Sequence, residues 1–338
     1  MLLKMEDLAA ELMVLADSWT TYVIRSTTRM LATLKTLLTL RESSFWWPYI
    51  GAFVLWAAWA FKTTYQGKGI RSFLRFCFPK EFYFHRSTAT DVQVYLMNLF
   101  FQLPSLVFPG VGAAVVATTI LGLDWSKVES YPLGPWESIP FLLVWVLTEE
   151  LGYYAAHRMY HRVPFLWEFH KVHHSAEVLT PLTIFRKHPA FDATSGMFIT
   201  LIRGVVLAAL VAAFNIEFSA VHIVGLTVYR STFRFFGQHL RHSHIWWAWD
   251  RRISHVFISP AQHQIHHSYL PEHLNKNFGE VFALWDWLFG SLYVAGERED
   301  LAIGLGEEHE ITNGVAAYLV PFRNIGRMAQ SSIRRWVR

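Results

Sequence analysis

Histidine supplies the most distinctive chemistry in this sequence. Of the 17 histidines in 338 residues, six lie within residues 157–188 and eight within residues 239–273. Their spacing repeats: HRMYH places two histidines four residues apart, and HKVHH and HQIHH each place three at positions i, i+3 and i+4. Residues three and four apart lie on one face of a helix. Such a face presents several imidazole nitrogens, which suit iron, zinc, copper and nickel.

The spacings define ten candidate metal ligands in four sets. One four-coordinate zinc ion could not use ten imidazoles, whereas two metal ions with about five nitrogens each could, leaving open positions for O2. A di-iron site built on carboxylates needs Glu-x-x-His pairs, and the zinc proteases need HExxH; the sequence contains neither motif. The ten candidates are His157, His161, His170, His173, His174, His239, His242, His263, His266 and His267.

The other histidines have weaker grounds for a metal role. His244 is two positions from His242, roughly 200° further round a helix, so we expect it to face away from the metal. His188, in KHPAF, has three open interpretations: a metal ligand, a residue that supports a ligand, or a loop residue. The histidines left without a role are His85, His222, His255, His273 and His309.

The composition favours a membrane protein. Hydrophobic residues make up 53% of the chain and charged residues 17%, against about 25% charged in a soluble domain. The same values exclude a disordered chain. The 15 tryptophans and 13 tyrosines are typical of a protein that meets the lipid–water interface. The single cysteine, Cys77, excludes disulfides, cysteine-based zinc modules and an iron–sulfur cluster within the chain.

Long apolar runs predict a multi-pass topology. The basic loop at residues 62–86 predicts a cytoplasmic location by the positive-inside rule, and the order of the later spans then brings every histidine cluster to the cytoplasmic face. Nucleic-acid binding is not expected, because no basic face exists outside the C-terminal tail. The expected spans are residues 45–61, 92–123, 139–156, 195–214 and about 219–236. Pro104, Pro109 and Gly110 interrupt residues 92–123, which form either one kinked span or a helical hairpin.

The fold class that follows is all-α. We expect a polytopic membrane helical bundle of about four to five spanning helices, with a cytoplasmic helical cap that holds a histidine-ligated dimetal centre. The predicted organisation is an amphipathic interfacial segment at 1–44, transmembrane helices at 45–156, a histidine-box catalytic region at 157–310 with a further transmembrane hairpin at about 195–238, and a basic tail at 311–338.

The motifs taken together resemble a known family. HRMYH, then FHKVHH, then SPAQHQIHHS followed by NFGEVFALWDWLFGS, is similar to the fatty acid hydroxylase / sterol desaturase superfamily over about residues 147–293. The resemblance implies a dinuclear iron centre, two Fe per chain, held by the ten candidates above. His239 is carried over from a branch with a different local spacing, and His188 resembles the His-Pro of the sterol-desaturase branch.

Two carboxylates join the candidate catalytic residues. The superfamily commonly has an aspartate seven residues before the first box histidine, and Glu150 stands at that position. We expect Glu150 to accept the distal N–H of a ligand imidazole, with Asp286 in WDWLFG as a second candidate for the same role. The alternative for Glu150 is a charge at the membrane boundary, although two turns before His157 is deep for such a residue.

The resemblance implies an O2-dependent enzyme that hydroxylates or desaturates an unactivated C–H position of a lipid. Sterol, fatty acyl chain, ether lipid and carotenoid substrates all stay open. Because the chain shows no haem domain, cysteine cluster or GxGxxG motif, we expect a separate electron donor: a cytochrome b5-like protein, a ferredoxin or a flavin reductase. The rival interpretations are a histidine-lined metal or proton transporter, which predicts histidines inside the spans, and a metal-dependent membrane hydrolase.

Overall fold

The computed structural model describes part of the chain. The described residues are 47–98, 116–117, 119–120, 122, 136, 138–214, 228–229, 232–306 and 308–336. Contacts divide the chain into Met1–Gly51 and Ala52–Arg338, and the account below concerns the second unit. The interfacial helix expected at 1–44 lies outside the described residues, as does most of the spans expected at 92–123 and 219–236.

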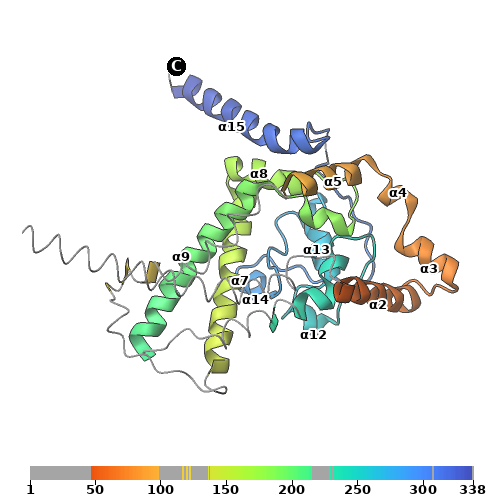
Figure 1. Cartoon of the computed structure of the whole chain (residues 1–338). Coiled ribbons are helices and arrows are strands. Elements are labelled where there is room, and N and C mark those ends of the chain that lie inside the picture. The colour runs from red at the N-terminus through yellow and green to blue at the C-terminus, as the bar shows by residue number, and fades with distance from the viewer. Residues whose placement is uncertain are drawn as a thin grey trace, which may run out of the picture. The chain divides into compact units, whose positions relative to one another are not determined.

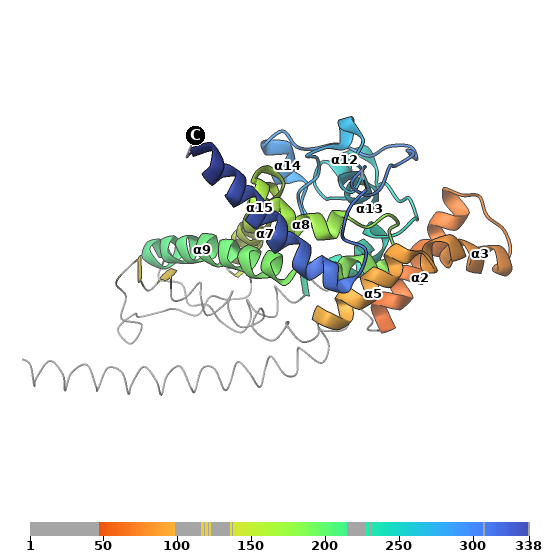
Figure 2. The ribbon, with the colours of Figure 1, turned by 90° about the horizontal axis from the view of Figure 1, so that it is seen from above.

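The described part is helical, which confirms the all-α class for those residues. It contains isolated bridges, Phe257 to Phe282 and Ser268 to Ile303, and no named strand. Figures 1 and 2 show the arrangement. The longer helices are α2 (Trp47–Thr63), α3 (Ile70–Cys77), α5 (Arg86–Asn98), α7 (Ser138–Arg162), α8 (Pro164–His174), α9 (Pro189–Phe214) and α15 (Gly314–Trp336). The short ones are α4 (Lys80–Tyr83), η1 (Pro181–Phe185), the π-helical η2 (Arg234–Gln238), α11 (His239–Arg241), α12 (Arg251–Ser254), α13 (Pro260–His266), η3 (Pro271–His273) and α14 (Leu284–Leu288).

Helices α7 and α9 form an intimate antiparallel pair. A Cβ added at Gly152 of α7 would lie 3.0 Å from the Ile199 Cα of α9, so glycine permits this close approach. Nearer the opposite end of the pair, the Tyr160 hydroxyl donates to the Ala190 carbonyl at 3.1 Å. These two contacts define which residue of α9 lies at the same level, along the axis of the helix pair, as each residue of α7.

Among the described residues, one helical stretch has the length and composition to cross a membrane. It is Pro189–Leu210 of α9, with a mean hydropathy of 1.7. Helix α7 covers the span expected at 139–156, and α2 covers the described part, residues 47–61, of the span expected at 45–61. The total of four to five spans stays a prediction.

A buried arginine joins α5, η1 and the end of α8. The guanidinium of Arg186 is 1% exposed and donates to Asp91 at 3.0 Å. It also donates to the Ser87 and Ser175 hydroxyls and to the Val172 carbonyl. A buried charge is tolerable only when it is paired and hydrogen-bonded in this way. The Arg186 network therefore fixes α8 against α5.

Helix α15 covers this junction from outside. Ala317 and Val320 of α15 pack with Val94, Val172 and Ile311 in one buried cluster. The Asn324 amide donates to the Glu168 carboxylate of α8 at 2.7 Å. The expected basic tail is thus a helix that packs on α8 and α5, as both views show (Figures 1 and 2).

Removing the partner of Arg186 tests this network. Asp91→Ala should lower the free energy of unfolding by about 3–5 kcal/mol, because the guanidinium stays buried without its counter-ion. Denaturation in detergent micelles measures the change. Arg86→Ala is the control, since Arg86 pairs with Glu177 from a side chain that is 77% exposed. If Asp91→Ala and Arg86→Ala lower the free energy of unfolding by the same amount, the buried Arg186–Asp91 pair is not the main connection between α5 and α8.

Candidate metal centre

The histidines that come together lie on three helices and at two C-caps, His242 after α11 and His267 after α13. Helix α7 ends at Arg162 and α8 starts at Pro164, a proline at a helix N-terminus whose fixed φ suits that position. The extended Val163 between them, with φ −101° and ψ 114°, turns the chain sharply. This turn brings the end of α7 beside the end of α8. Helix α13 faces both, and His242 follows α11 as its C-cap.

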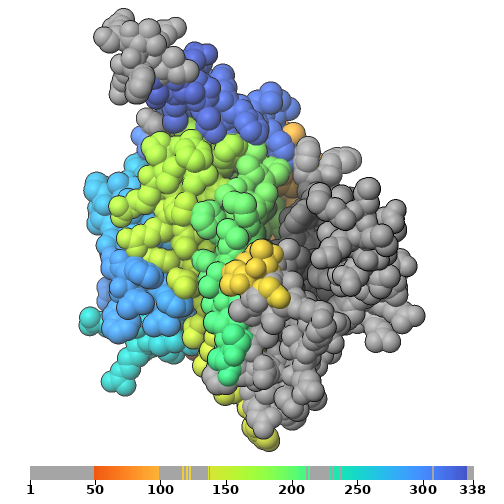
Figure 3. Space-filling model, turned by 90° about the vertical axis from the view of Figure 1, so that its left-hand side faces the viewer, coloured from red at the N-terminus to blue at the C-terminus, as the bar shows by residue number. Residues whose placement is uncertain are grey.

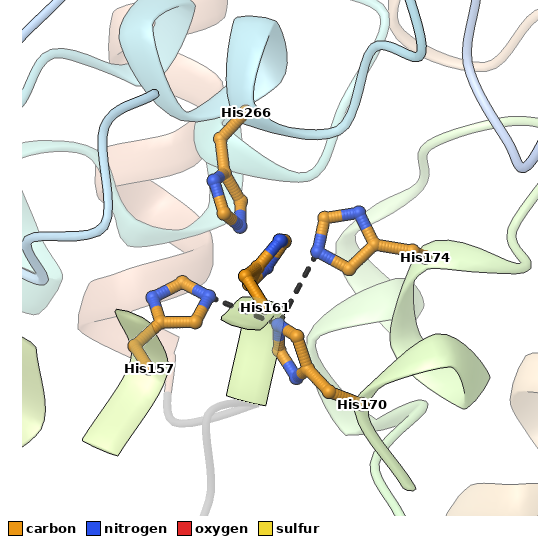
Figure 4. Close-up of side chains that lie close together, drawn as sticks. All are labelled: His157, His161, His170, His174 and His266. Atoms are coloured by element: carbon orange, nitrogen blue, oxygen red, sulfur yellow. Dashed lines mark hydrogen bonds between the residues drawn. The ribbon is translucent and has the colours of Figure 1, made fainter. Parts of the chain in front are cut away.

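Five imidazoles form one group, the five-histidine group. Their nearest ligand nitrogens all lie within 4.8 Å of one another. The Nε2 atom of His170 is 2.9 Å from that of His157 and 3.2 Å from that of His174, as the dashed lines of Figure 4 mark. Figure 4 also shows His161 and His266 pointing into the same space. The group is His157, His161, His170, His174 and His266.

Four further imidazoles form the four-histidine group, under the same 4.8 Å limit. Here the Nε2 atom of His242 lies 3.2 Å from that of His173 and 3.0 Å from that of His263. The His267 ring completes the group, 4.5 Å from the His173 ring between centroids. All four residues are buried.

Each HxxHH box is divided between the two groups. On α8, His170 and His174 enter the five-histidine group and His173 the four-histidine group. On α13 the division is reversed, because His263 and His267 enter the four-histidine group and His266 the other. The i, i+4 pair and the i+3 residue of a box therefore face two different centres.

Backbone carbonyls set the tautomers of three of these rings. The Nδ1 atom of His157 lies 2.7 Å from the Phe278 oxygen, and that of His266 lies 2.7 Å from the Lys276 oxygen. His173 Nδ1 lies 3.3 Å from the oxygen of Arg186, the residue at the centre of the buried network. Since a carbonyl only accepts, each Nδ1 carries the proton and each Nε2 presents a lone pair.

Burial keeps the imidazoles uncharged. Desolvation lowers the pKa of His266 to about 4, and lowers the pKa of His170 well below the usual histidine value. Repulsion between neighbouring rings lowers the pKa of His170 further. The same direction holds for the other seven members of the two groups. Neutral imidazole is the form that binds a metal.

The donor set fits transition-metal ions. The buried Nε2 atoms of His161, His266 and His267 have no hydrogen-bond partner among the described residues. Unpartnered buried nitrogen is costly, and a cation at the focus of each group would satisfy it. Imidazole-only donors suit iron, zinc, copper or nickel and do not suit magnesium or calcium. The geometry and the chemistry together indicate a metal centre.

Glu150 and Asp286 lie close to the centre, with partners other than the expected imidazoles. The Glu150 carboxylate accepts from the backbone amides of Val281 and Phe282 and from the Tyr229 hydroxyl. Seven residues of α7 separate Glu150 from His157, about 10 Å along the axis, so its side chain falls short of that ring. Its position suits a role in holding the loop that begins at Phe278.

Asp286 holds the same loop from the other side. Its carboxylate accepts from the amides of Phe278 and Gly279 at 2.8 and 2.7 Å and from the Ser291 hydroxyl at 2.6 Å. A Cβ at Gly279 would lie 2.4 Å from the Phe282 oxygen, so only glycine allows this turn. The two carboxylates thereby orient the Phe278 carbonyl that binds His157.

Sequence reasoning did not single out two glutamines, Gln262 and Gln264, whose side chains support the third histidine box, HQIHH. Gln264 donates to the carbonyls of Leu240 and Ile245, and so ties α13 to the segment that carries His242. Gln262 completes a capping box with Ser259 at the start of α13. A signal was present, because both glutamines lie inside the box motif SPAQHQIHH, on a short helix that is buried throughout.

Two candidate ligands lie outside both groups. His188 contacts the rings of Phe169 and Phe322, and its Nε2 lies 3.3 Å from the Tyr318 oxygen. His239 is buried edge-on to Phe53. Three unassigned histidines also lie elsewhere: His244 beside the Phe76 oxygen, His255 beside the Arg251 oxygen, and His273 beside Glu299.

A separate cavity of about 200 Å³ borders Glu150. The carboxylates of Glu149 and Glu280 and the Tyr229 hydroxyl also line it. Glu149 is already paired with Arg203. A wall with these acidic groups does not suit an alkyl chain.

Comparison with known proteins supports the site. Residues 142–291, which carry the three histidine boxes, match the family model Fatty acid hydroxylase. The match confirms the resemblance drawn from the motifs. No solved structure matches the chain significantly.

Curated relatives include hydroxylases and monooxygenases of lipids. The alkylglycerol monooxygenase of Caenorhabditis elegans is 28% identical over 193 residues, 57% of this chain and 34% of that protein. The human alkylglycerol monooxygenase is 24% identical over 204 residues, 60% and 40% of the two chains. The ornithine lipid hydroxylase OlsE of Rhizobium tropici is 28% identical over 182 residues, 53% and 49%. The matches thus span between a third and a half of these relatives.

Hydrogen exchange tests how the loop at Phe278 is held. Asp286→Ala removes the hydrogen bonds that this carboxylate accepts from the Phe278 and Gly279 amides, each worth about 1.5–3 kcal/mol, together with the one from the Ser291 hydroxyl. The amides of Phe278 and Gly279 should therefore exchange at least tenfold faster, as mass spectrometry of the peptide can measure. Asp250→Ala removes a similar carboxylate contact, to the Arg252 amide at the start of α12, and should leave this peptide unchanged. Unchanged exchange in Asp286→Ala would contradict the role given to Asp286.

Proposed function

We propose that this protein is a membrane-bound, O2-dependent lipid hydroxylase with two iron ions. The observation that carries the proposal is the pair of all-imidazole groups that share the two HxxHH boxes. The family match and the names of the lipid hydroxylase relatives support the reaction class. The ligands would be the nine histidines of the two groups, and His188 and His239 would have other roles.

The overall reaction balances with an external reductant. An R–H bond, O2, two electrons and two protons give R–OH and H2O. When bound, the iron pair supplies the activation of O2 that an unactivated C–H bond requires. The chain itself supplies the neutral imidazoles, the carbonyls that orient them, and a buried space that excludes water. A separate electron-donor protein would deliver the electrons.

Hydroxylation is favoured over desaturation by the relatives' names. Alkylglycerols and ornithine lipids both join a long alkyl chain to a polar group. We therefore propose that the substrate is such a polar lipid, with the alkyl chain in the bilayer. The proposed topology is multi-pass, with α9 crossing the membrane and the histidine groups at its cytoplasmic end.

Metal content tests the ligand set. Purified protein loaded anaerobically with Fe²⁺ should hold two ions per chain. His173→Ala should lose about half or more of this iron, because removal of a ligand or its support typically costs at least 10–100-fold in affinity. His244→Ala is the matched control and should keep its iron, since His244 lies outside both groups. Full iron in His173→Ala, or loss in His244→Ala, would overturn the assignment.

Oxygen labelling tests the reaction. The iron-loaded protein in lipid vesicles, supplied with a ferredoxin and its reductase, should convert an alkylglycerol or an ornithine lipid to a hydroxylated product. Under ¹⁸O2 the product mass should rise by the label, and under argon no product should form. A lipid cleavage product that forms without O2 and takes its oxygen from water would instead identify a hydrolase.

A further inference from the structure

An exposed apolar patch lies beside the metal centre, and neither the reaction nor the ligand set requires it. Three members follow one another at the end of α14, and three lie on or just after α12. Their exposed fractions run from 37% to 62%. On a soluble protein, large exposed apolar side chains seldom form a contiguous patch. We call this set the α12–α14 patch: Ile253, Val256, Phe257, Trp287, Leu288 and Phe289.

The two halves of the patch are joined by backbone and ring contacts. The Ala283 amide, directly before α14, donates to the Val256 carbonyl at 2.9 Å. The rings of Phe257 and Phe282 lie 5.2 Å apart between centroids. Asp286, the buried residue of α14, fixes the helix through the contacts described above. The patch is therefore a built surface rather than a set of separate side chains.

Two contacts attach the patch to α7 and define the level of the patch along the α7 axis. The ring of Phe289 stacks on Tyr154 at 5.4 Å between centroids, and Arg158 donates to the Phe289 carbonyl at 3.2 Å. Figure 3 shows the light-blue segment around residue 290 on the surface beside yellow-green α7, with green α9 on the other side of α7. The stacking on Tyr154 thus sets the level of α14 along the helix pair.

That level falls within the candidate span of α9. Gly152 of α7 faces Ile199 of α9, and Tyr160 faces Ala190. Tyr154 is two residues, about 3 Å, from Gly152 towards the Pro189 end. Because Ile199 is about 15 Å inside the span from Pro189, Tyr154 and the stacked Phe289 lie about 12 Å inside it.

We infer that the α12–α14 patch is immersed in the bilayer and is covered by the acyl chains of membrane lipids. If Pro189–Leu210 crosses the membrane, side chains at this height on the outside of α7 meet hydrocarbon or the interface. Exposed tryptophan, leucine and phenylalanine suit that environment.

A lipid-facing surface would then lie next to the candidate metal centre. The loop that starts at Phe278 binds His157 through its carbonyl and continues into α14. A lipid tail lying on the patch would thus be adjacent to the loop that orients the five-histidine group. The inference rests on the proposed membrane placement of α9 and does not depend on the reaction.

Site-directed spin labelling measures the depth of the patch. The single native cysteine, Cys77, is buried, and Cys77→Ala provides the background. Leu288→Cys, with Ile253→Cys as a second probe from α12, is labelled with a nitroxide in vesicles of phosphatidylcholine and phosphatidylglycerol. Leu274→Cys is the matched control, because Leu274 is similarly exposed, 52% against 60%, and lies outside the patch. Leu201→Cys, on the exposed face of α9, reports whether α9 is in the membrane.

The expected result is a ratio of O2 to water-soluble nickel-chelate collisions at 288 and 253 that is several-fold above that at 274 and close to that at 201. High nickel access at 288 and 253 with low access at 201 would overturn the patch alone and would indicate a protein partner or free solvent. High nickel access at 201 would overturn the membrane placement and the patch together. Iron content of each labelled variant, compared with the background, verifies that the centre is intact.

Discussion

Nine imidazoles share two small buried volumes, and they can do so only while uncharged. A proton on any of these rings would be both desolvated and repelled by the others, and burial therefore keeps their pKa values low. A neutral imidazole can bind a cation only through the nitrogen that carries the lone pair. Each ring therefore needs one defined tautomer, with its N–H directed away from the cation. The rest of the described structure can be understood as the means by which those tautomers are fixed.

Backbone carbonyls fix three of these rings, and buried polar side chains hold two of the three carbonyls, those of Phe278 and Arg186. The Phe278 carbonyl is oriented by a loop that Asp286 and Glu150 grip from two sides. The Arg186 carbonyl belongs to the residue whose guanidinium joins α5 to α8 through Asp91. Charges that have no contact with the centre thus control it through the main chain. Buried charged residues such as Glu150, Arg186 and Asp286 therefore have a structural role, although charged residues make up only 17% of the chain.

Sequence spacing was sufficient to find the histidines that lie together and insufficient to find the residues that support them. The two i, i+3, i+4 boxes supplied six of the nine residues that meet, the i, i+4 pair of HRMYH supplied two, and His242 of the i, i+3 pair supplied the ninth. His188 has no such spacing and lies elsewhere, and His239 also lies elsewhere although it is three residues before His242. Glu150 occupies the position expected of a supporting carboxylate, yet its partners are amides 131 and 132 residues away. Such contacts depend on loop geometry, which leaves little trace in spacing, and the roles of Arg186 and Gln264 were hidden for the same reason. The helical class was predictable for the described residues, whereas the number of spans was not decided by the one apolar helix they contain.

The reversed division of the two HxxHH boxes has a mechanical consequence. Helix α8 contributes two rings to one group and one to the other, and α13 does the opposite. Neither helix can slide or rotate without disturbing both groups at once. A cation bound in either group would therefore hold two helices that also carry rings of the other group.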